Sequence, residues 1–211
     1  MKIAIIGSGN MGSGLARLFA AKGQDVVLAD EDISIATRQA ADIGTNVQGA
    51  EIGAAVVGAD IVILAIPYAA APAVLKAAGS LSGKILVDIT NPITPDYMAL
   101  TIGHTTSAAE EIAKLAPDAR VVKAFNTVFW QALPFAVRKG KAAVQVLMAG
   151  DDAEAKATMA ALITALDFEA VDAGPLINAR YIEPVGELNI QFGYALGWGT
   201  AVSPAWVRLD K

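Results

Sequence analysis

Three glycines near the start of the chain have the spacing of a phosphate-binding loop. They are Gly7, Gly9 and Gly12 in the stretch IIGSGNMGSG, and together they form the pattern G-x-G-x-x-G. In such a loop the first glycine permits a tight turn, the second lets the backbone approach a pyrophosphate, and the third lets the next helix lie close to the strand. The N–H groups at the helix N-terminus then attract the diphosphate. The alternative is a glycine turn that binds nothing.

The segments around these glycines favour phosphate binding. A predicted strand at residues 2–6 precedes the loop, a predicted helix at residues 11–22 follows it, and a second strand at residues 25–29 leads to Asp30, 18 residues after Gly12. All three features are typical of dinucleotide-binding folds. The sequence therefore predicts that the chain binds an adenosine dinucleotide.

Asp30 indicates which dinucleotide is favoured. A carboxylate at this position accepts hydrogen bonds from the adenosine ribose and repels a 2′-phosphate. Glu31 and Asp32 add negative charge, whereas Arg38, on the next predicted helix, is the arginine that could still reach a phosphate. These residues favour NAD over NADP.

Polar residues and prolines follow three further predicted strands. Ile66 and Pro67 end one strand, Asn91 follows the next, and Asn126 and Thr127 follow the one after. Ligands of open α/β sheets bind outside the carboxyl ends of the strands, so these loops are expected to border the cofactor. Taken singly, each of these residues is also a common turn former.

The elements that must position these residues alternate along the chain. Short apolar runs predict strands at residues 2–6, 25–29, near 46, 60–66, 84–89, 120–124, 143–149 and 168–171. Helical patterns lie between them at residues 11–22, 33–43, 69–78, 108–115 and 153–166. This alternation is typical of a sheet with helices on both faces. The predicted fold class is α/β, with a Rossmann-type, doubly wound and mostly parallel sheet.

The composition excludes several other kinds of chemistry. The 211 residues include no cysteine and one histidine, His104, so disulfides and a cysteine nucleophile are excluded and no metal site is predicted. The net charge of −5 and the scattered basic residues argue against a nucleic-acid partner. The chain begins without a signal-peptide pattern, and its longest uncharged run, residues 188–207, contains Asn189, Gln191 and Pro204. We expect a cytoplasmic protein with no membrane partner.

The chain is expected to form one main domain with an appended helix. Residues 1–174 are predicted to be the dinucleotide-binding domain, and residues 175–211 a C-terminal helix and tail. This last piece is too short for a core of its own, so it must pack on the same domain or on a second subunit. The hydrophobic content is 55%, and the C-terminal piece is rich in glycine and in aromatic residues such as Trp198 and Trp206. A homodimer is therefore the expected assembly.

Six stretches spread over residues 7–184 resemble one family of enzymes. They are GSGNMGSGLA, AIPY, NPITPD, VVKAFNTVFWQAL, AGDD and DAGPLINARYIEP. The chain resembles the small NADP-dependent oxidoreductases that reduce the deazaflavin coenzyme F420, and the related nucleotide-binding domains of membrane metalloreductases. The resemblance implies that the dinucleotide lies along the first half of the sheet. It also implies that a flavin-like ring stacks on the nicotinamide in a cleft closed by the C-terminal helix.

The resemblance also implies roles for individual residues. The pyrophosphate would be bound by Gly7, Ser8, Gly9, Asn10, Met11 and Gly12. Ile66 and Pro67 would lie near the ribose and the nicotinamide, residues 126–128 (Asn126, Thr127 and Val128) would flank the two rings, and residues 174–178 would meet the second substrate. In one respect the chain departs from the family, whose members usually place a cationic pair after the second strand where this chain has Asp30 and Glu31.

The predicted function is hydride transfer between NAD(P) and a flavin or a deazaflavin such as F420, both small molecules. This reaction needs two rings held in contact and water excluded, rather than a positioned base. One alternative is a small-substrate dehydrogenase or imine reductase of the β-hydroxyacid dehydrogenase or pyrroline-carboxylate reductase type, but those enzymes append a helical domain that does not follow here. A second alternative is a non-catalytic NAD(P) sensor. We expect His104 to be a surface or capping residue.

Overall fold

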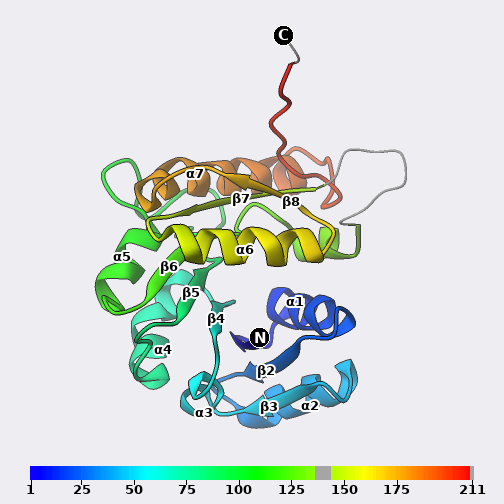
Figure 1. The fold of residues 1–211 in the computed structure, drawn as a ribbon. Helices are drawn as coiled ribbons and strands as arrows, with labels where there is room; N and C mark the ends of the chain where they lie inside the picture. The colour runs from blue at the N-terminus through cyan, green and yellow to red at the C-terminus, as the bar shows by residue number, and fades with distance from the viewer. Residues whose placement is uncertain (136–143, 210–211) are drawn as a thin grey trace.

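The computed structural model describes residues 1–135 and 144–209. Eight strands form one sheet in the order β3-β2-β1-β4-β5-β6-β7-β8 (Figure 1). The strands are β1 (Lys2–Ile6), β2 (Asp25–Ala29), β3 (Val47–Ala50), β4 (Ile61–Leu64), β5 (Ile85–Asp88), β6 (Arg120–Lys123), β7 (Gln145–Gly150) and β8 (Glu169–Asp172). All eight predicted strands are confirmed, with ends that shift by one or two residues; Ala143, the first residue of the predicted seventh strand, lies outside the described residues.

The sheet is parallel from β3 to β6 and reverses direction once. Ile3 of β1 pairs with Val26 of β2 and with Ile61 of β4. β7 runs antiparallel to β6, and β8 is parallel to β7. The prediction of a mostly parallel sheet is confirmed, because the direction changes only between β6 and β7. The last two strands thus extend the six parallel strands of a dinucleotide-binding sheet.

Helices cover both faces of the sheet. The helices are α1 (Asn10–Ala21), α2 (Ile33–Ile43), α3 (Ile52–Val56), α4 (Ala71–Ala78), α5 (Ala108–Leu115), α6 (Ala153–Ala165) and α7 (Ala179–Ile190). α1, α2 and α6 pack on one face, and α3, α4 and α5 pack on the other (Figure 1). The short α3 was not predicted, because its five residues are fewer than a helical pattern needs to stand out.

The last helix crosses β7 and β8 on the face opposite to α6 (Figure 1). Ile182 of α7 is buried against Leu147 and Ala149 of β7. A π-helical turn at Gln191–Ala195 ends the helix, and the last part of the tail projects away from the body of the molecule. The main chain of Trp206 is held by the side chain of Gln145, which both donates to it at 3.0 Å and accepts from it at 2.6 Å. None of the helices in the described part of the chain has the length and apolar character needed to cross a bilayer.

Candidate active site

In the glycine loop between β1 and α1, two of the three glycines have no room for a side chain, and the third faces open space. Gly7 has φ +104°, and a Cβ there would overlap the carbonyl oxygen of Ala65. A Cβ on Gly12 would overlap the carbonyl oxygen of Gly7, so this glycine lets α1 start directly against the turn. A Cβ on Gly9 would meet nothing within 4 Å. Gly9 therefore leaves an open approach to the N-terminus of α1, where unpaired N–H groups can receive an anion.

Asp30 lies directly beside this loop. Its Oδ2 accepts hydrogen bonds from the main-chain N–H of Ser8 at 2.9 Å and from the Ser8 hydroxyl at 2.5 Å. Burial works to raise the pKa of Asp30, but the hydrogen bonds from Ser8 outweigh it and hold the pKa below its ordinary value. The side chain is therefore a carboxylate at neutral pH, and its second oxygen receives only a long 3.4 Å contact from the N–H of Asp32.

Ile66 and Pro67 follow β4 at the same edge of the sheet. The Cγ2 of Ile66 lies 3.0 Å from the position that a Cβ on Gly7 would take, so this half-buried side chain packs on the glycine turn. Pro67 is exposed. Arg38 is an exposed residue of α2, and its charge adds to the hydrogen bonds from Ser34 that lower the pKa of Asp32.

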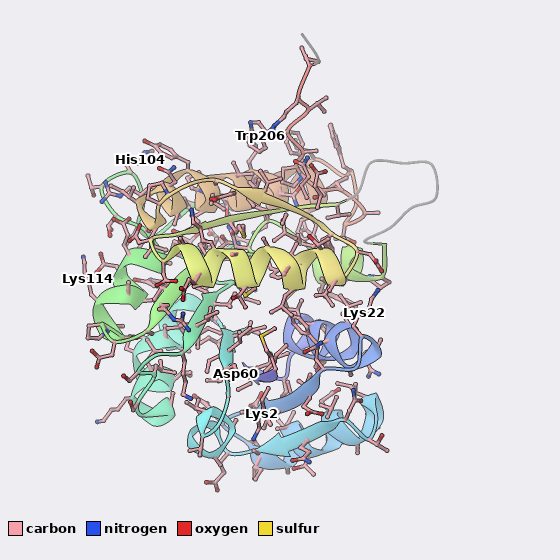
Figure 2. The ribbon with its side chains drawn as sticks, viewed as in Figure 1. Lys2, Lys22, Asp60, His104, Lys114 and Trp206 are labelled. Carbon is pink, nitrogen blue, oxygen red and sulfur yellow. The ribbon has the colours of Figure 1, made fainter. Side chains whose placement is uncertain are left out.

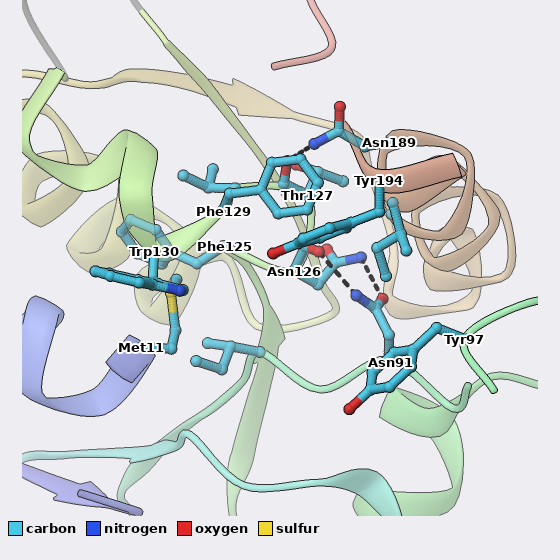
Figure 3. A pocket seen from close by; sticks show the side chains of 14 residues that line it. Met11, Asn91, Tyr97, Phe125, Asn126, Thr127, Phe129, Trp130, Asn189 and Tyr194 are labelled. Carbon is cyan, nitrogen blue, oxygen red and sulfur yellow. Dashed lines mark hydrogen bonds between the residues drawn. The ribbon is translucent and has the colours of Figure 1, made fainter. Parts of the chain in front are cut away.

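A cavity of about 340 Å³ adjoins the first turn of α1 (Figure 3). Four segments contribute to its wall: the start of α1, the loop after β5, the loop after β6, and α7 with its π-helical turn. The lining residues are Met11, Ile89, Asn91, Tyr97, Phe125, Asn126, Thr127, Val128, Phe129, Trp130, Gly186, Asn189, Ile190 and Tyr194. The structure thus brings five of the predicted site residues, from three separate segments, to one cavity.

The aromatic side chains give this cavity a mouth suited to flat ligands. Phe129 and Tyr194 meet edge to face with ring centroids 5.5 Å apart, and Tyr194, Tyr97 and Trp130 are all exposed. Tyr97 and the buried Phe125 both have φ near +60°, a conformation that costs energy for a non-glycine residue. Strained backbone in two residues of one cavity wall is typical of a functional site.

Asn91 and Asn126 join the two loops that form the cavity floor (Figure 3). The Nδ2 of Asn91 donates to the main-chain oxygen of Asn126 at 2.8 Å, and the Nδ2 of Asn126 donates to Oδ1 of Asn91 at 2.9 Å. Gly186 of α7 lies against both amides, since a Cβ there would be 2.8 Å from Oδ1 of Asn91 and 3.0 Å from Nδ2 of Asn126. The amide pair therefore closes the floor against α7.

A buried ionic cluster lies beneath this floor. The Nζ of Lys123 is 2.8 Å from Oδ2 of Asp88 and 2.8 Å from Oε1 of Glu183, and it also donates to the main-chain oxygen of Thr90. All three charged side chains are almost completely buried. Burial works to lower the pKa of Lys123, but the attraction of the two carboxylates outweighs it and raises the pKa.

The N-terminus of α5 compensates the extra negative charge of this cluster. The carboxylate of Glu183 accepts hydrogen bonds from the N–H groups of Ala108 at 2.9 Å and Ala109 at 3.1 Å. A helix N-terminus carries partial positive charge, so it stabilises a carboxylate there. Sequence analysis missed the whole cluster. The available signals were a lysine inside the apolar run VVKAF and a glutamate directly before Pro184 in the last helix.

Comparison with known proteins places the chain in a family. Residues 2–92 match the family described as NADP oxidoreductase, coenzyme F420-dependent. The F420-dependent NADP reductase of Methanothermobacter marburgensis is 32% identical over 206 residues, which cover 90% of this chain and 91% of that protein. The chain belongs to the F420-dependent NADP reductase family. It is therefore an NAD(P)-dependent oxidoreductase.

Other relatives agree with this family. A solved structure from Arthrobacter sp. FB24, provisionally described as an F420-dependent NADP reductase, has a TM-score of 0.88 and 31% identity and covers 99% of this chain and 100% of its own. The metalloreductase STEAP3 of Rattus norvegicus is 33% identical over 184 residues, but the chain spans only 36% of the length of that protein. A reductive aminase from Aspergillus terreus, at 21% identity and a TM-score of 0.68, shares the fold.

Two of the motifs that carry the family resemblance, KAFNT and RYIEP, have structural roles at this site. KAFNT supplies Lys123 to the ionic cluster and Asn126 and Thr127 to the cavity. RYIEP supplies Glu183 to the cluster and Arg180, which forms a two-bond ion pair with Glu110 of α5 at 2.9 and 2.7 Å. In this F420-dependent NADP reductase family member, KAFNT therefore lines the cavity, and both motifs attach α7 to the rest of the protein.

The resemblance assigns residues 174–178 to the second substrate. Residues 174–178 do not line the cavity, because they form the turn that attaches α7 to β7: the N–H of Leu176 donates to Asp151 at 2.9 Å, and Asn178 donates to the main-chain oxygen of Ala173 at 2.6 Å. Gly186, Asn189 and Ile190, further along α7, reach the cavity instead. Sequence analysis did not single out these three residues.

Histidine and clustered carboxylates, the usual metal ligands, are not found at the described site. His104 lies on an exposed loop and is not part of the cavity wall (Figure 2). Among residues 1–135 and 144–209, no group of three or more histidine, aspartate or glutamate side chains is placed to hold a metal ion. The loop and the cavity offer main-chain N–H groups, amides and aromatic rings, which can bind and orient ligands.

Proposed function

We propose that the chain transfers a hydride between a nicotinamide dinucleotide and the ring of a flavin or of a deazaflavin such as F420. The observation that carries this proposal is the cavity that adjoins the glycine loop. Met11, from the first turn of α1, forms part of the same wall as Asn126 and Tyr194. A dinucleotide whose pyrophosphate lies on the loop would thus bring its reactive ring to a cavity lined by aromatic side chains and amides.

The chain's own residues would bind and orient the two coenzymes. The main-chain N–H groups of residues 9–12 would hold the pyrophosphate, because those of Gly7 and Ser8 already donate to Ala29 and Asp30. Gly7 and Ser8 would shape the turn beneath it, and the open side of Gly9 supports this role. Ile66 and Pro67 would border the ribose and the nicotinamide, with Asn91 on the other side. Asn126, Thr127 and Val128 would flank the rings, and the aromatic mouth would exclude water. The coenzymes themselves supply the hydride chemistry.

For the choice of dinucleotide, we propose that Asp30 favours NAD(H). Its carboxylate is ionised and lies beside the loop, with Oδ1 held only by the long contact from Asp32. This oxygen would accept a hydrogen bond from the ribose, whereas a 2′-phosphate would be repelled. The relatives named as NADP reductases give the opposite expectation, so the affinities for NADH and NADPH decide this preference.

We also propose separate roles for the two parts of the chain, and a homodimer. Residues 1–174 would bind the dinucleotide, and residues 175–211 would complete the cavity and form the contact between two copies. Support comes from three exposed aromatic residues on this C-terminal part, Tyr194, Trp198 and Trp206. Figure 2 shows Trp206 on the tail. Light scattering should give the mass of two chains; the mass of one chain would contradict the homodimer.

The two competing functions predict different outcomes of one experiment. The purified protein is mixed with NADH or NADPH and, in separate reactions, with F420, FMN and FAD, and the absorbance of both coenzymes is followed. Transfer to any of the three supports the proposal. Binding of the dinucleotide without transfer to any of them would overturn it and favour a sensor, whereas dinucleotide oxidation only with a carbonyl or imine compound would favour a small-substrate dehydrogenase.

A further inference from the structure

The orientation of the Asn126 amide is fixed by main-chain groups. Its Nδ2 donates to Oδ1 of Asn91 at 2.9 Å and to the main-chain oxygen of Ile182 at 3.2 Å. A main-chain oxygen can only accept, so the NH2 group and not the oxygen must face α7. Asn91 is oriented in the same way, because its own NH2 group donates to the main-chain oxygen of Asn126. Both hydrogens of the Asn126 amide are thus used within the protein.

The oxygen of this amide has no partner among residues 1–135 and 144–209. Within that part of the chain, Oδ1 of Asn126 is buried without a hydrogen bond, and so is Oγ1 of Thr127, the next residue. Both residues line the cavity, and they are only 8% and 1% exposed (Figure 3). Buried polar atoms are almost always paired in folded proteins, so two adjacent exceptions in one cavity wall need an explanation. A bound ligand that pairs with both atoms provides it.

Gly186 keeps the amide pair in place from the other side. It is buried in α7, and a Cβ there would come within 3.0 Å of side-chain atoms of both Asn91 and Asn126. Any larger residue would displace one amide or both. Asn91, Asn126 and Gly186 also come three positions after Asp88, Lys123 and Glu183 respectively, so the buried ionic cluster fixes the three segments that carry them.

We propose that Oδ1 of Asn126 accepts a hydrogen bond from an N–H that is bonded to a carbonyl group on a ring bound in the cavity, while the Thr127 hydroxyl faces that carbonyl. Asn91 and Gly186 are positioning residues that keep the oxygen, and not the NH2 group, turned to the ring. Two rings of the proposed reaction carry this chemistry, the carboxamide of the nicotinamide and the imide of a flavin or deazaflavin. Because these two rings are those of the proposed reaction, the inference rests on the proposed function.

Analogues that lack the N–H test the proposal and identify its source. One comparison uses NAD(P) against its 3-acetylpyridine analogue, in which a methyl group replaces the amide NH2, with dissociation constants from calorimetry in the absence of any acceptor. The other uses riboflavin against N3-methylriboflavin, with kcat and KM measured separately. The wild type should bind one methyl analogue roughly tenfold more weakly than its parent, since a buried acceptor is left unpaired.

Three variants show which residues read the N–H. Asn126→Ala, Asn91→Leu and Gly186→Ala should each reduce the tenfold preference to about twofold or less. Gly186→Ala is the sharpest of them, because alanine is a better helix residue than glycine and the variant should still fold. Asn46→Ala is the matched control: Asn46 also donates to two main-chain oxygens, those of Ala20 and Gln24, but lies far from the cavity in the sheet order. It should keep the preference.

The outcomes separate this inference from the proposed function. No preference in the wild type for either parent compound would overturn the inference, and so would a preference that survives in Asn126→Ala or disappears in Asn46→Ala. A preference for the nicotinamide carboxamide together with no transfer to any flavin or deazaflavin would support the inference and overturn the proposed function alone.

Discussion

The ammonium nitrogen of Lys123 lies 2.8 Å from Oε1 of Glu183, and this contact joins β6 in the middle of the sheet to α7 at its edge. A buried ion pair is stabilising only if its remaining hydrogen-bonding capacity is satisfied. Here Asp88, the carbonyl of Thr90 and the N-terminus of α5 provide the further partners. The cluster therefore ties together the three segments whose next turns or loops form the floor of the cavity.

Removing the charge of Lys123 should destabilise the protein strongly. Lys123→Met would leave two buried carboxylates without their cation, and breaking a buried pair in this way typically costs about 3–5 kcal/mol. Urea unfolding measures the loss. Lys22→Met is the control, because the 2.8 Å pair of Lys22 with Asp167 is exposed (Figure 2) and should contribute about 0–1 kcal/mol. Equal losses in the two variants would show that the buried cluster has no special role.

The ion pair between Glu110 and Arg180 predicts how stability depends on pH. The hydrogen bonds from Arg180 hold the pKa of Glu110 below its ordinary value in the folded protein. Burial opposes this effect, and the hydrogen bond from Ser107 adds to it. The ion pair therefore stabilises the folded protein fully above the pKa that Glu110 has in the unfolded chain, about 4.3. This contribution is lost as the pH falls through the lower pKa of the folded protein. In urea unfolding between pH 7 and pH 3, Glu110→Gln should be less stable than the wild type at pH 7 and should lose less on acidification.

The partner arginine provides a check on this assignment. Arg180→Met removes the main cause of the lowered pKa but keeps the carboxylate. It should flatten the acid limb of the stability curve as Glu110→Gln does, and the double variant should add little to either. Acid limbs that match the wild type in both single variants would assign the pH dependence to other carboxylates.

Much of the fold could be predicted because its signals are local. The eight apolar runs, the glycine loop and the residues that follow each strand are all defined by neighbours in the sequence, and parallel strands bring such residues to one edge. For the ionic cluster, the local signals are a lysine within an apolar run and a glutamate before Pro184, and neither of them indicates its partner. Lys123 meets Asp88 over a separation of 35 residues and Glu183 over 60 residues, and no spacing rule connects such positions.

The position of residues 174–178 outside the cavity could not be predicted for a related reason. A glycine and proline turn before the last helix predicts where the helix begins, but not which turn of the helix reaches the cavity. That position depends on how α7 is fixed to the sheet, through Glu183 and Arg180. Gly186 could not be recognised for the same reason, since its role depends on two asparagines from other segments.

The glycine loop gives a prediction that separates stability from binding. Gly12→Ala would force a Cβ into the carbonyl oxygen of Gly7 and should cost several kcal/mol of folding free energy, of the order of other severe overpacking changes. Gly9→Ala meets nothing within 4 Å and should change the free energy of unfolding by less than about 1 kcal/mol. If the pyrophosphate lies on the loop, Gly9→Ala should still weaken dinucleotide binding by at least about tenfold, because the added methyl occupies the approach to the helix.

Unfolding in urea and calorimetry with NADH and NADPH measure the two effects. Gly53→Ala is the control, because Gly53 lies in α3, away from the loop, and does not have a positive φ. Gly23 is unsuitable, because its φ of +75° would strain an alanine. Gly53→Ala should leave binding unchanged. Unaltered dinucleotide binding by Gly9→Ala would place the phosphates elsewhere.

The final prediction concerns the carboxylate of Asp30 and the choice of dinucleotide. Asp30→Ser removes a charge that would face a 2′-phosphate and should raise the affinity for NADPH relative to NADH by about tenfold, which corresponds to roughly 1.4 kcal/mol of repulsion at a partly exposed site. Both affinities should also fall somewhat, because Ser8 loses the acceptor of its two hydrogen bonds. Ser8→Ala is the matched control: it removes the 2.5 Å hydroxyl bond but keeps the charge, so it should weaken both dinucleotides without changing their ratio. Calorimetry on the three proteins gives both dissociation constants, and a ratio that stays constant in Asp30→Ser would mean that this carboxylate only braces the glycine loop and does not face the ribose.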